Sequence, residues 1–529
     1  MSFKGTLLPY QPEAVDKMCQ RTKMLVAYDL GLGKTVITIA AIERLMDEGK
    51  VKEPGIVVCL SSLKYQWANQ IKKFTNDTSK AIVIDGSKAK RQSQYQEAYN
   101  WKETKVDYVI MNYEQVVNDW DLIKKLPRGF VVLDEATAIK SFRSKRSKYT
   151  KRLGTSPFKF ALTGTPIENG KPEELFSIMQ FVDAEVLGRF DLFDQAFIVR
   201  NNWGGVERYR NLPTLHTRLS TACVRKAQKD PDVAPYLPDT IHNDPLVVPF
   251  DRKSAKLYEK IKTDLLYDLQ EAQDLFGSSF NIMSHYGLES KSGGPEDEMR
   301  GKIMSKIGAL KMLCSHPDLL RTSAQKFKQM NGEGSSYANE LFESGLLEDI
   351  KISNKLETMT EYALDFLEQN DNHKVVIFAS YVDMLDKIAE KLGTKRCRLY
   401  SGKLDAKTKE ENKIAFNEDS SVRVLISSDA GGYGVDLPAA NLLINYDLPW
   451  SSGSAAQRNG RIKRASSTWE SIVIQDLLMG GSIEVRQHDM LQQKNAVANA
   501  VIDGEGIDDK GGVKLTVQSL SKFLQGESV

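Results

Sequence analysis

The stretch Tyr28-Asp29-Leu30-Gly31-Leu32-Gly33-Lys34-Thr35 decides the fold class of this chain. It follows a short apolar run at 24–27 and precedes a second one at 36–42. That order predicts a buried strand, a glycine turn and a helix, whose backbone N–H groups and N-terminus attract phosphate oxygens. Lys34 is placed to reach the β- and γ-phosphates of a nucleotide, and the Thr35 hydroxyl to ligate Mg²⁺. The strict pattern has a glycine six positions before the lysine, where this chain has Tyr28.

Composition limits the classes of protein to consider. The 529 residues suit two or three domains, and the net charge of +2 means that nucleic-acid binding must come from local patches. Five scattered cysteines and six dispersed histidines argue against a zinc site and a disulfide scaffold. Neither a membrane-length apolar run nor a signal-peptide pattern is seen. We therefore expect no membrane association, and a cytoplasmic location in a bacterial or phage-infected cell, or a nuclear one if the source is eukaryotic.

The rhythm of apolar runs predicts an α/β fold with two parallel-sheet lobes and helical insertions between them. Strand-like runs occupy 56–60, 81–84, 108–111, 130–133 and 158–162, and again 375–379, 422–426, 441–445 and 471–474. Helical patterns cover 252–275 and 298–315, and a last amphipathic segment covers 515–524. We predict an N-terminal lobe at 1–240, a helical region at 241–350 and a C-terminal lobe at 351–529. One phosphate loop for two lobes suggests a nucleotide shared across a cleft.

A pair of acids follows the apolar run at 130–133. Asp134 stands at the predicted carboxyl end of that strand, where it can hold Mg²⁺ through water, and Glu135 is placed to polarise an attacking water. The alternative is a pair of solvated acids after a strand.

Two further segments complete a candidate catalytic set. Thr163-Gly164-Thr165, at another strand end, can bond the acids and pass their state to the next lobe. Without the other motifs, a tight turn would be the favoured interpretation of this segment. Arg461 and Arg464 are three positions apart, which predicts one helix face. From the second lobe they could act as arginine fingers, worth about 10³–10⁵ in rate. A solvated basic helix is the alternative.

In this order, the motifs resemble helicase superfamily two and, within it, the Swi/Snf-type ATPase motors. Besides those above, the resemblance rests on 8–15, 57–74, 111–114, 224–226, 310–317, 376–385 and 428–437. Residues 310–317, with Cys314-Ser315-His316-Pro317, carry much of the subfamily assignment. Thr137 stands in place of the usual histidine, Glu168 in place of glutamine, and Ala465-Ser466-Ser467 in place of Ile-Gly-Gln.

The resemblance implies a compact bacterial or phage DNA translocase with two RecA-like lobes. It would hydrolyse ATP with Mg²⁺ on binding DNA and move along duplex DNA. The implied nucleotide-binding residues are Gln11, Asp29, Gly31, Gly33, Lys34, Thr35, Gly434, Asp436 and Gln457; the catalytic ones are Lys34, Asp134, Glu135, Arg461 and Arg464, and the metal ligands are Thr35 and Asp134. Two alternatives stay open: a strand-separating DNA or RNA helicase, and an ATP-gated DNA clamp with little turnover.

The run at 140–152 is the strongest candidate for nucleic-acid contact. It holds seven basic and no acidic residues, and Lys140, Arg143 and Lys145 are of a type that contacts phosphates without reading sequence. A solvated face and a localisation signal are the alternatives. Lys64, Asn112, Tyr113, Ser401, Gly402 and Trp450 are further candidates, mainly through the resemblance. We expect a monomer that binds duplex DNA without sequence preference and with strong salt dependence, and we leave targeting protein partners open.

Overall fold

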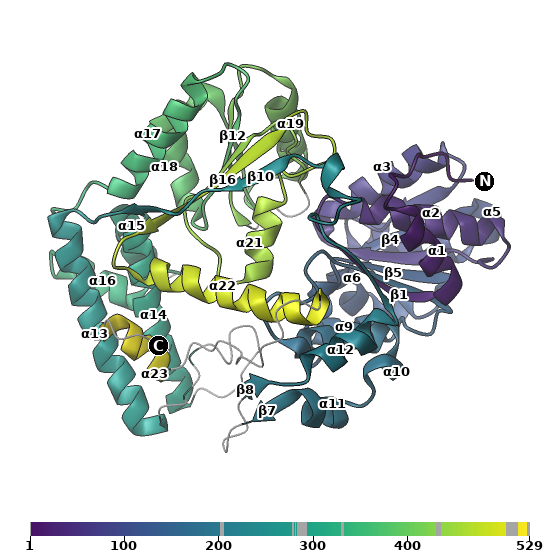
Figure 1. Cartoon of the computed structure of the whole chain (residues 1–529), viewed down its shortest axis with the longest axis horizontal. Coiled ribbons are helices and arrows are strands. Elements are labelled where there is room, and N and C mark those ends of the chain that lie inside the picture. Colours follow the sequence, from purple (N-terminus) through teal and green to yellow (C-terminus); the bar gives the residue numbers. More distant parts are fainter. Residues whose placement is uncertain are drawn as a thin grey trace. The chain divides into compact units, whose positions relative to one another are not determined.

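The computed structural model describes residues 2–200, 206–277, 280, 282, 294–329, 333–429, 435–503 and 517–525. The chain divides into two compact units. The first comprises Met1–Pro238, Ser451–Ser466 and Lys494–Gly512, and the second comprises Asp239–Trp450, Ser467–Gln493 and Val513–Val529. Each unit contains one large parallel sheet (Figure 1), which confirms the predicted α/β class with two parallel-sheet lobes. The helices predicted within 241–350 belong to the second unit.

The sheet of the first unit has the strand order β3-β4-β2-β5-β6-β1-β9, and all of its neighbouring strands are parallel. The five strands expected after the glycine loop are all present, whereas β9 at the edge was not predicted. The strands are β1 (Lys23–Tyr28), β2 (Gly55–Cys59), β3 (Lys80–Val83), β4 (Val106–Asn112), β5 (Phe130–Asp134), β6 (Phe158–Leu162) and β9 (Cys223–Lys226).

Both faces of this sheet are covered, which explains why its strands are apolar at nearly every position. Leu25 and Ala27 pack into one hydrophobic core, while their neighbours Met24, Val26 and Tyr28 pack into another on the opposite face. The helices of this unit are α1 (Pro12–Arg21), α2 (Lys34–Asp47), α3 (Lys64–Thr75), α4 (Lys88–Tyr99), α5 (Trp101–Thr104), α6 (Tyr113–Asn118), α7 (Trp120–Ile123), α8 (Lys145–Lys151), α9 (Pro172–Val182), α10 (Ala184–Leu187), α11 (Phe190–Phe197), α12 (Leu212–Ser220) and α21 (Ser452–Asn459). A small antiparallel hairpin, β7 (Ile198–Arg200) and β8 (Val206–Tyr209), follows α11.

Strand register places three of the predicted motifs at one edge of the sheet. Leu162 of β6 pairs with Val26 of β1 on one side and with Asp134 of β5 on the other. The carboxyl ends of these three strands therefore lie together, and the chain leaves them as the glycine loop, as Glu135 and as Thr163.

The second unit has its own parallel sheet, in the order β10-β16-β15-β12-β14-β13, with β11 also paired to β16. The four predicted strands are present, and β10, β11 and β13 were not predicted. The strands are β10 (Asp239–His242), β11 (Leu246–Val248), β12 (Val375–Phe378), β13 (Cys397–Tyr400), β14 (Val424–Ser427), β15 (Leu442–Asn445) and β16 (Ser471–Met479).

Helices α13 (Arg252–Phe276) and α14 (Pro295–Ser315) confirm the two helices predicted in the middle of the chain. They pack with neighbouring helices around a core separate from the one beside the sheet. The remaining helices are α15 (Pro317–Lys328), α16 (Ser336–Glu343), α17 (Asn354–Glu368), α18 (Val382–Leu392), α19 (Ala406–Glu418), α22 (Ile483–Ile502), which begins in this unit, and α23 (Val517–Gln525). Of the helices that the structure describes, none is long and apolar enough to cross a membrane.

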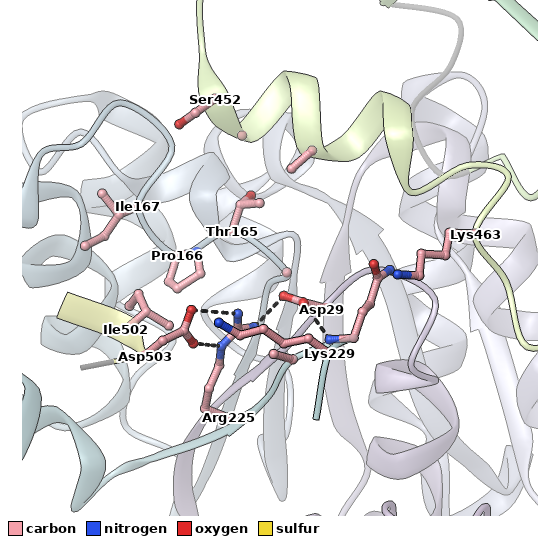
Figure 2. A pocket seen from close by; sticks show the side chains of 15 residues that line it. Asp29, Thr165, Pro166, Ile167, Arg225, Lys229, Ser452, Lys463, Ile502 and Asp503 are labelled. Carbon is pink, nitrogen blue, oxygen red and sulfur yellow. Dashed lines mark hydrogen bonds and ion pairs between the residues drawn. The ribbon is translucent and has the colours of Figure 1, made fainter. Parts of the chain in front are cut away.

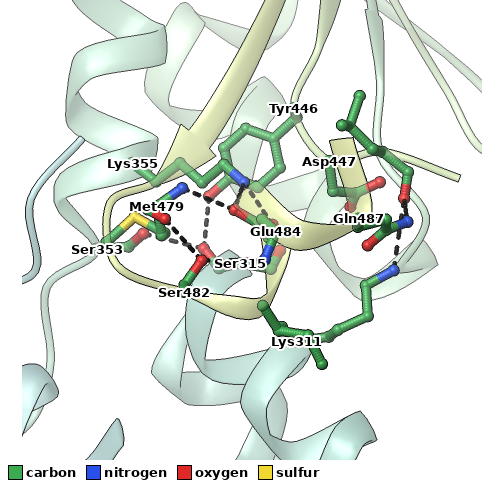
Figure 3. A network of polar contacts seen from close by, with 12 residues as sticks. Lys311, Ser315, Ser353, Lys355, Tyr446, Asp447, Met479, Ser482, Glu484 and Gln487 are labelled. Carbon is green, nitrogen blue, oxygen red and sulfur yellow. Dashed lines mark hydrogen bonds and ion pairs between the residues drawn. The ribbon is translucent and has the colours of Figure 1, made fainter. Parts of the chain in front are cut away.

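A buried ion pair in the second unit joins α17 to the start of α22 (Figure 3). The Lys355 ammonium donates to both carboxylate oxygens of Glu484 at 2.7 Å, and the two side chains are 0% and 1% exposed. The carbonyl of Ser315, at the end of α14, accepts from the Ser353 hydroxyl at 2.9 Å and the Tyr446 hydroxyl at 2.5 Å. Desolvation offsets much of the attraction between two buried charges. We therefore expect the Lys355–Glu484 pair to fix the register in which its two helices pack more than to add stability.

Candidate nucleotide site

The glycine loop turns where its two glycines allow it. Gly31 and Gly33 have φ values of 83° and 80°, in the left-handed region that favours glycine, and α2 begins at Lys34. Tyr28, at the position of the missing glycine, is the last residue of β1 and is fully buried. Its hydroxyl donates to the carbonyl of Tyr10 at 3.1 Å. A regular strand conformation needs no glycine, so this departure leaves the turn intact.

Two side chains pack directly against this loop. A Cβ at Gly33 would collide with Nε2 of Gln11, and one at Gly31 would lie 2.7 Å from Nη1 of Arg464. Gln11 also donates to the carbonyl of Leu32 at 3.1 Å. The loop therefore has glycine where neighbouring side chains leave no room for a Cβ.

The Lys34 ammonium is held at the start of the loop. Its Nζ donates to the carbonyls of Tyr28 at 2.9 Å and Asp29 at 3.3 Å. Burial lowers the pKa of Lys34, while the carboxylates of Glu135, Asp134 and Asp29 act in the opposite direction. A phosphate here would meet the Lys34 ammonium, whose charged form the three nearby carboxylates favour.

Asp134 is oriented by its surroundings. Its carboxylate accepts from the Trp67 indole N–H at 2.7 Å and from the backbone N–H of Glu135 at 3.0 Å. The Tyr113 hydroxyl donates to the Asp134 carbonyl at 2.8 Å. The side chain is 7% exposed, and burial raises the pKa of Asp134.

Glu135 combines a strained backbone with a carboxylate that is not fully satisfied. Its φ of 50° and ψ of 58° are rare for a residue with a side chain, and such strain clusters at functional sites. Among the described residues its buried Oε2 has no hydrogen-bond partner. Burial, then the Asp134 carboxylate, raises the pKa of Glu135 to about 7, while Lys34 and Arg461 act to lower it. This environment suits a group that takes a proton from water near neutral pH.

The Thr163-Gly164-Thr165 segment and α21 both pack on the glycine loop. The Thr163 hydroxyl accepts from the backbone N–H of Thr165 at 3.1 Å. A Cβ at Gly164 would lie 3.0 Å from Cγ of Leu30, and one at Gly460 would lie 2.9 Å from Cβ of Leu30. Leu30 therefore contacts both segments.

The prediction that Arg461 and Arg464 share a helix face is wrong. Helix α21 ends at Asn459, and Gly460 follows it, so both arginines lie beyond the helix. They are nevertheless buried, at 3% and 7% exposed, as is Gln457 at 5%. Arg461 acts on the pKa of Glu135, and Arg464 on that of Lys34. Both lie within the first unit.

A cavity of about 350 Å³ lies beside the glycine loop (Figure 2). Arg225 of β9 crosses it: its guanidinium donates to Asp29 at 2.5 Å and to Asp503 at 2.6 Å. The other Asp29 oxygen accepts from the backbone N–H of Gln228 at 2.9 Å. The Asp29 carboxylate is thus bound by Arg225 of β9 and by the backbone just after β9, while Arg225 also binds Asp503.

Several predicted site residues are not among the described residues of the first unit. Gly434 is outside the described residues, while Asp436, Ser401, Gly402 and Trp450 belong to the second unit. Asp436 and Gly402 are exposed, whereas Ser401 is buried. Trp450 is half-buried, with the Lys311 ammonium 4.7 Å from the centre of its ring.

Burial counts against direct nucleic-acid contact by two predicted side chains. Lys64 is 2% exposed and donates to the carbonyl of Ile84 and the carboxylate of Asp85 at 2.9 and 2.7 Å. Tyr113 is 1% exposed and bonds to the Asp134 carbonyl. The Asn112 side chain caps α6 by accepting from the N–H of Gln115.

The basic segment, residues 140–152, follows the acid pair closely. The short 3₁₀ helix Ala136–Ile139 separates them, and α8 occupies most of the segment. Arg143 and Lys145 are exposed, while Lys140 forms an ion pair with Glu168. The exposure of Arg143 and Lys145 is thus compatible with their predicted contacts to nucleic acid.

Sequence reasoning missed the supporting roles of Trp67, Arg225 and Glu168. Trp67 alone had a usable signal, because a buried indole N–H needs an acceptor. Arg225 and Glu168 lie far along the chain from the groups that they contact, so no local pattern marks them.

Comparison with known proteins adds two family matches. Residues 10–319 match the SNF2-related domain, and residues 354–466 match the helicase conserved C-terminal domain. The chain is 25% identical over 514 residues to YwqA of Bacillus subtilis (strain 168), a candidate ATP-dependent helicase/translocase, covering 95% of this chain and 50% of that protein. It is 27% identical over 501 residues to the DNA repair and recombination protein RAD54-like of Gallus gallus, covering 91% and 64%.

Among solved structures, the SWI2/SNF2 ATPase core of Sulfolobus solfataricus in complex with dsDNA is 24% identical. The match covers 95% of this chain and 94% of that one, with a TM-score of 0.42, an overlay too loose to place individual residues. The chain spans about half the length of YwqA and less than two thirds of the RAD54-like protein.

Proposed function

Because this chain belongs to the family of SNF2-related domains, here with a helicase C-terminal domain, we propose that it is a DNA-dependent ATPase that moves along duplex DNA. One observation carries the hydrolytic part of this proposal. Glu135, a buried carboxylate with an oxygen that has no partner among the described residues, lies at the same sheet edge as the Lys34 loop and Asp134. A water-activating carboxylate next to a phosphate loop is what ATP hydrolysis requires.

The residues present fit ATP and Mg²⁺. The loop N–H groups and Lys34 would hold the phosphates, and Thr35 and Asp134 would hold the metal, directly or through water. Trp67 keeps one Asp134 oxygen oriented, as expected for a supporting hydrogen bond to a metal-binding group. Bound Mg²⁺ would supply positive charge to the β- and γ-phosphates.

The protein's own side chains have separate roles in ATP hydrolysis. Glu135 takes the proton of the attacking water, and its pKa near neutrality suits that role. Lys34, Arg461 and Arg464 offer positive charge where negative charge develops on the transferred phosphoryl group. Gln11 packs against Gly33, and the family resemblance implies that it contacts the base of ATP.

We extend the proposal to DNA through the basic segment. Its exposed Arg143 and Lys145 suit contacts to the phosphate backbone, which carries no base sequence. Binding is then sequence-nonspecific and falls steeply with salt.

The test is the steady-state ATPase rate of the full chain with blunt duplex DNA, single-stranded DNA and RNA. We expect the strongest stimulation by duplex DNA. Turnover that no nucleic acid changes would overturn the proposal. Stimulation mainly by tailed substrates, together with strand separation, would favour a helicase instead.

A variant pair tests the catalytic assignment. Glu135→Gln should lower kcat by about 10²–10⁴, the usual share of general-base catalysis, while ATP binding persists. Glu97→Gln, which alters a surface partner of Lys80, is the matched control and should leave the rate unchanged. Near-normal turnover in Glu135→Gln would remove Glu135 from this role.

A further inference from the structure

The last turn of α22 is seated in the core of the first unit. Val501 and Ile502 are buried and belong to the same hydrophobic core as the apolar residues of α12. The Val501 carbonyl accepts from Nδ1 of His216, also of α12, at 3.0 Å. Asp503 follows the helix directly, and its side chain is 13% exposed. The end of α22 therefore has a defined place in the first unit.

One guanidinium connects this helix end to the glycine loop (Figure 2). Arg225 of β9 donates from Nε and Nη2 to the two carboxylate oxygens of Asp503, at 2.6 and 3.4 Å. From Nη1 it donates to a carboxylate oxygen of Asp29 at 2.5 Å and to the carbonyl of Ala27 at 2.8 Å. Because the two acids use separate N–H groups of the guanidinium, Arg225 binds both of them at the same time.

Asp29 in turn positions the start of the loop and the Lys34 ammonium. Its second carboxylate oxygen accepts from the backbone N–H of Gln228 at 2.9 Å. Its carbonyl accepts from Nζ of Lys34 at 3.3 Å. Hydrogen bonds therefore run without a break from Asp503 through Arg225 and Asp29 to the lysine that would hold the phosphates.

The partly buried Arg225 side chain depends on both of its acidic partners. It lines the cavity of about 350 Å³ beside the loop. If Asp503 lost its charge, the guanidinium would keep only one of its two counter-charges, and hydration in the cavity would compete with the remaining bonds. A guanidinium turned into the cavity no longer holds Asp29 and the Ala27 carbonyl. The loop would then spend less time in the conformation that binds phosphate.

We propose that Asp503 is a positioning residue for the nucleotide site. It acts through Arg225 and Asp29, and it makes ATP binding depend on whether the end of α22 is seated. Because it concerns the same glycine loop, this inference rests on the proposed function. By linkage, the factor by which a seated helix end tightens ATP binding is also the factor by which bound ATP favours the seated end.

Asp503→Asn and Asp183→Asn form a matched pair. Asp183 pairs with Arg21 at 3.2 Å, and its side chain is 16% exposed. Among the described residues, neither member of that pair hydrogen-bonds to the glycine loop, and asparagine keeps the cap that Asp183 gives α10. Binding of a fluorescent ATP analogue with Mg²⁺ is titrated on the full chain below its melting temperature.

Asp503→Asn should weaken binding of the analogue by about three- to tenfold. This is the cost for a loop that is in its binding conformation for roughly a tenth to a third of the time. Asp183→Asn should bind the analogue as the wild type does. Asp503→Glu keeps the negative charge and should bind the analogue more tightly than Asp503→Asn.

Steady-state kinetics with saturating duplex DNA separate positioning from general damage to the fold. In Asp503→Asn the KM for ATP should rise, while kcat stays within about twofold of the wild-type value, because saturating ATP holds the loop in its binding conformation. A substitution that only destabilises the fold lowers the melting temperature without this division between KM and kcat.

Amide hydrogen exchange tests the reverse direction in the wild-type chain. A hydrolysis-resistant ATP analogue with Mg²⁺ should slow exchange in the last turn of α22, residues 499–502, by about the same three- to tenfold factor. In Asp503→Asn, the analogue at saturation should leave this exchange unchanged.

Each outcome decides one part of the proposal. Equal nucleotide affinity in Asp503→Asn and Asp183→Asn would overturn the inference, as would wild-type exchange at 499–502 that bound nucleotide does not change. A lower kcat with unchanged KM and affinity would also overturn it. All three results leave a DNA-stimulated ATPase standing. Turnover that no nucleic acid changes would overturn the proposed function, while the binding comparison still decides the inference. A wild type that binds no ATP analogue would overturn both.

Discussion

Two adjacent carboxylates at the end of β5 differ in what satisfies them. Asp134 accepts hydrogen bonds from Trp67 and from a backbone N–H, whereas Glu135 has a buried oxygen without a partner among the described residues. The first arrangement suits a fixed ligand, and the second suits a group that exchanges a proton. At the residue scale, this difference assigns the two acids to different tasks.

The raised pKa of Glu135 predicts a pH-dependent cost to stability. In the unfolded chain its pKa is 4.5, and in the fold it is about 7. Relative to the charged form, protonated Glu135 makes its full contribution to folding stability below pH 4.5. This contribution is lost as the pH rises to about 7. Glu135→Gln should therefore be more stable than the wild type at pH 8, by on the order of 1–3 kcal/mol, and not at about pH 4.5. Thermal unfolding across this range measures the difference; one that does not vary with pH would contradict the prediction.

The indole of Trp67 predicts an effect on metal affinity. Trp67→Phe keeps the buried ring but removes the hydrogen bond to Asp134. Loss of such a supporting bond typically costs about 10–100-fold in metal affinity. The Mg²⁺ concentration that gives half-maximal turnover should rise by that order. Trp101→Phe should not change it, because the half-buried Trp101 of α5 makes no hydrogen bond to either acid among the described residues. Equal Mg²⁺ dependence in the two variants would show that the bond is dispensable.

At the scale of elements, close approach of backbones positions the arginines. Helix α21 ends at Asn459, and its next residue, Gly460, contacts Leu30 of the glycine loop. Arg461 and Arg464 follow at once, so the seating of α21 on Leu30 determines where they lie. This close approach is possible because neither Gly460 nor Gly164 carries a Cβ.

A pair of glycine substitutions tests this seating. Gly460→Ala places a Cβ 2.9 Å from Cβ of Leu30, so α21 must shift and turnover should fall, by about tenfold or more for a displacement of the order of 1 Å. Gly308→Ala, in α14, meets nothing within 4 Å and should leave turnover unchanged while stabilising the helix by up to about 1 kcal/mol. ATPase rates and thermal melts of both variants give the comparison, and a fully active Gly460→Ala would show that this seating does not position the arginines.

At the scale of the whole molecule, the net charge of +2 leaves the basic segment as the main electrostatic feature of the proposed nucleic-acid contact. Its exposed cations include Arg143, Lys145 and Lys148, on or next to α8. A protein of nearly neutral charge that binds DNA must do so through such a local patch.

The salt dependence of duplex binding tests this patch. Changing Arg143, Lys145 and Lys148 to alanine should weaken binding on every sequence and reduce the slope of log K against log salt by about 0.9 for each phosphate that the variant no longer neutralises. Changing the exposed Lys102 and Lys105 of the same unit should alter neither. A triple variant with the wild-type slope would place the DNA-binding surface elsewhere.

Sequence alone predicted the helices, strands and turns that are determined by residues close together in the chain. The glycine loop, the strand ending at Asp134 and the two long helices of the middle region all follow from residues adjacent in the chain. The short strands β9 to β11 and β13 escaped prediction because they are partly exposed and, except for β11, lack a continuous apolar run, which the equally short β12, β14 and β15 have. The end of α21 before Arg461 was also missed, since spacing cannot show that Gly460 abuts Leu30.

Taken by itself, the sequence determined the α/β class, the phosphate loop and the identity of the acid pair, because strand and turn preferences act over a few residues. Only the tertiary structure decided that Gln11 and Arg464 fill the space around the loop glycines, that Trp67 orients Asp134, and that Glu168 joins Lys140 to α21. These interactions join residues that are distant in the chain, and packing and desolvation have no signature in the order of residues. Burial in the fold is likewise the main cause of the raised pKa of Glu135.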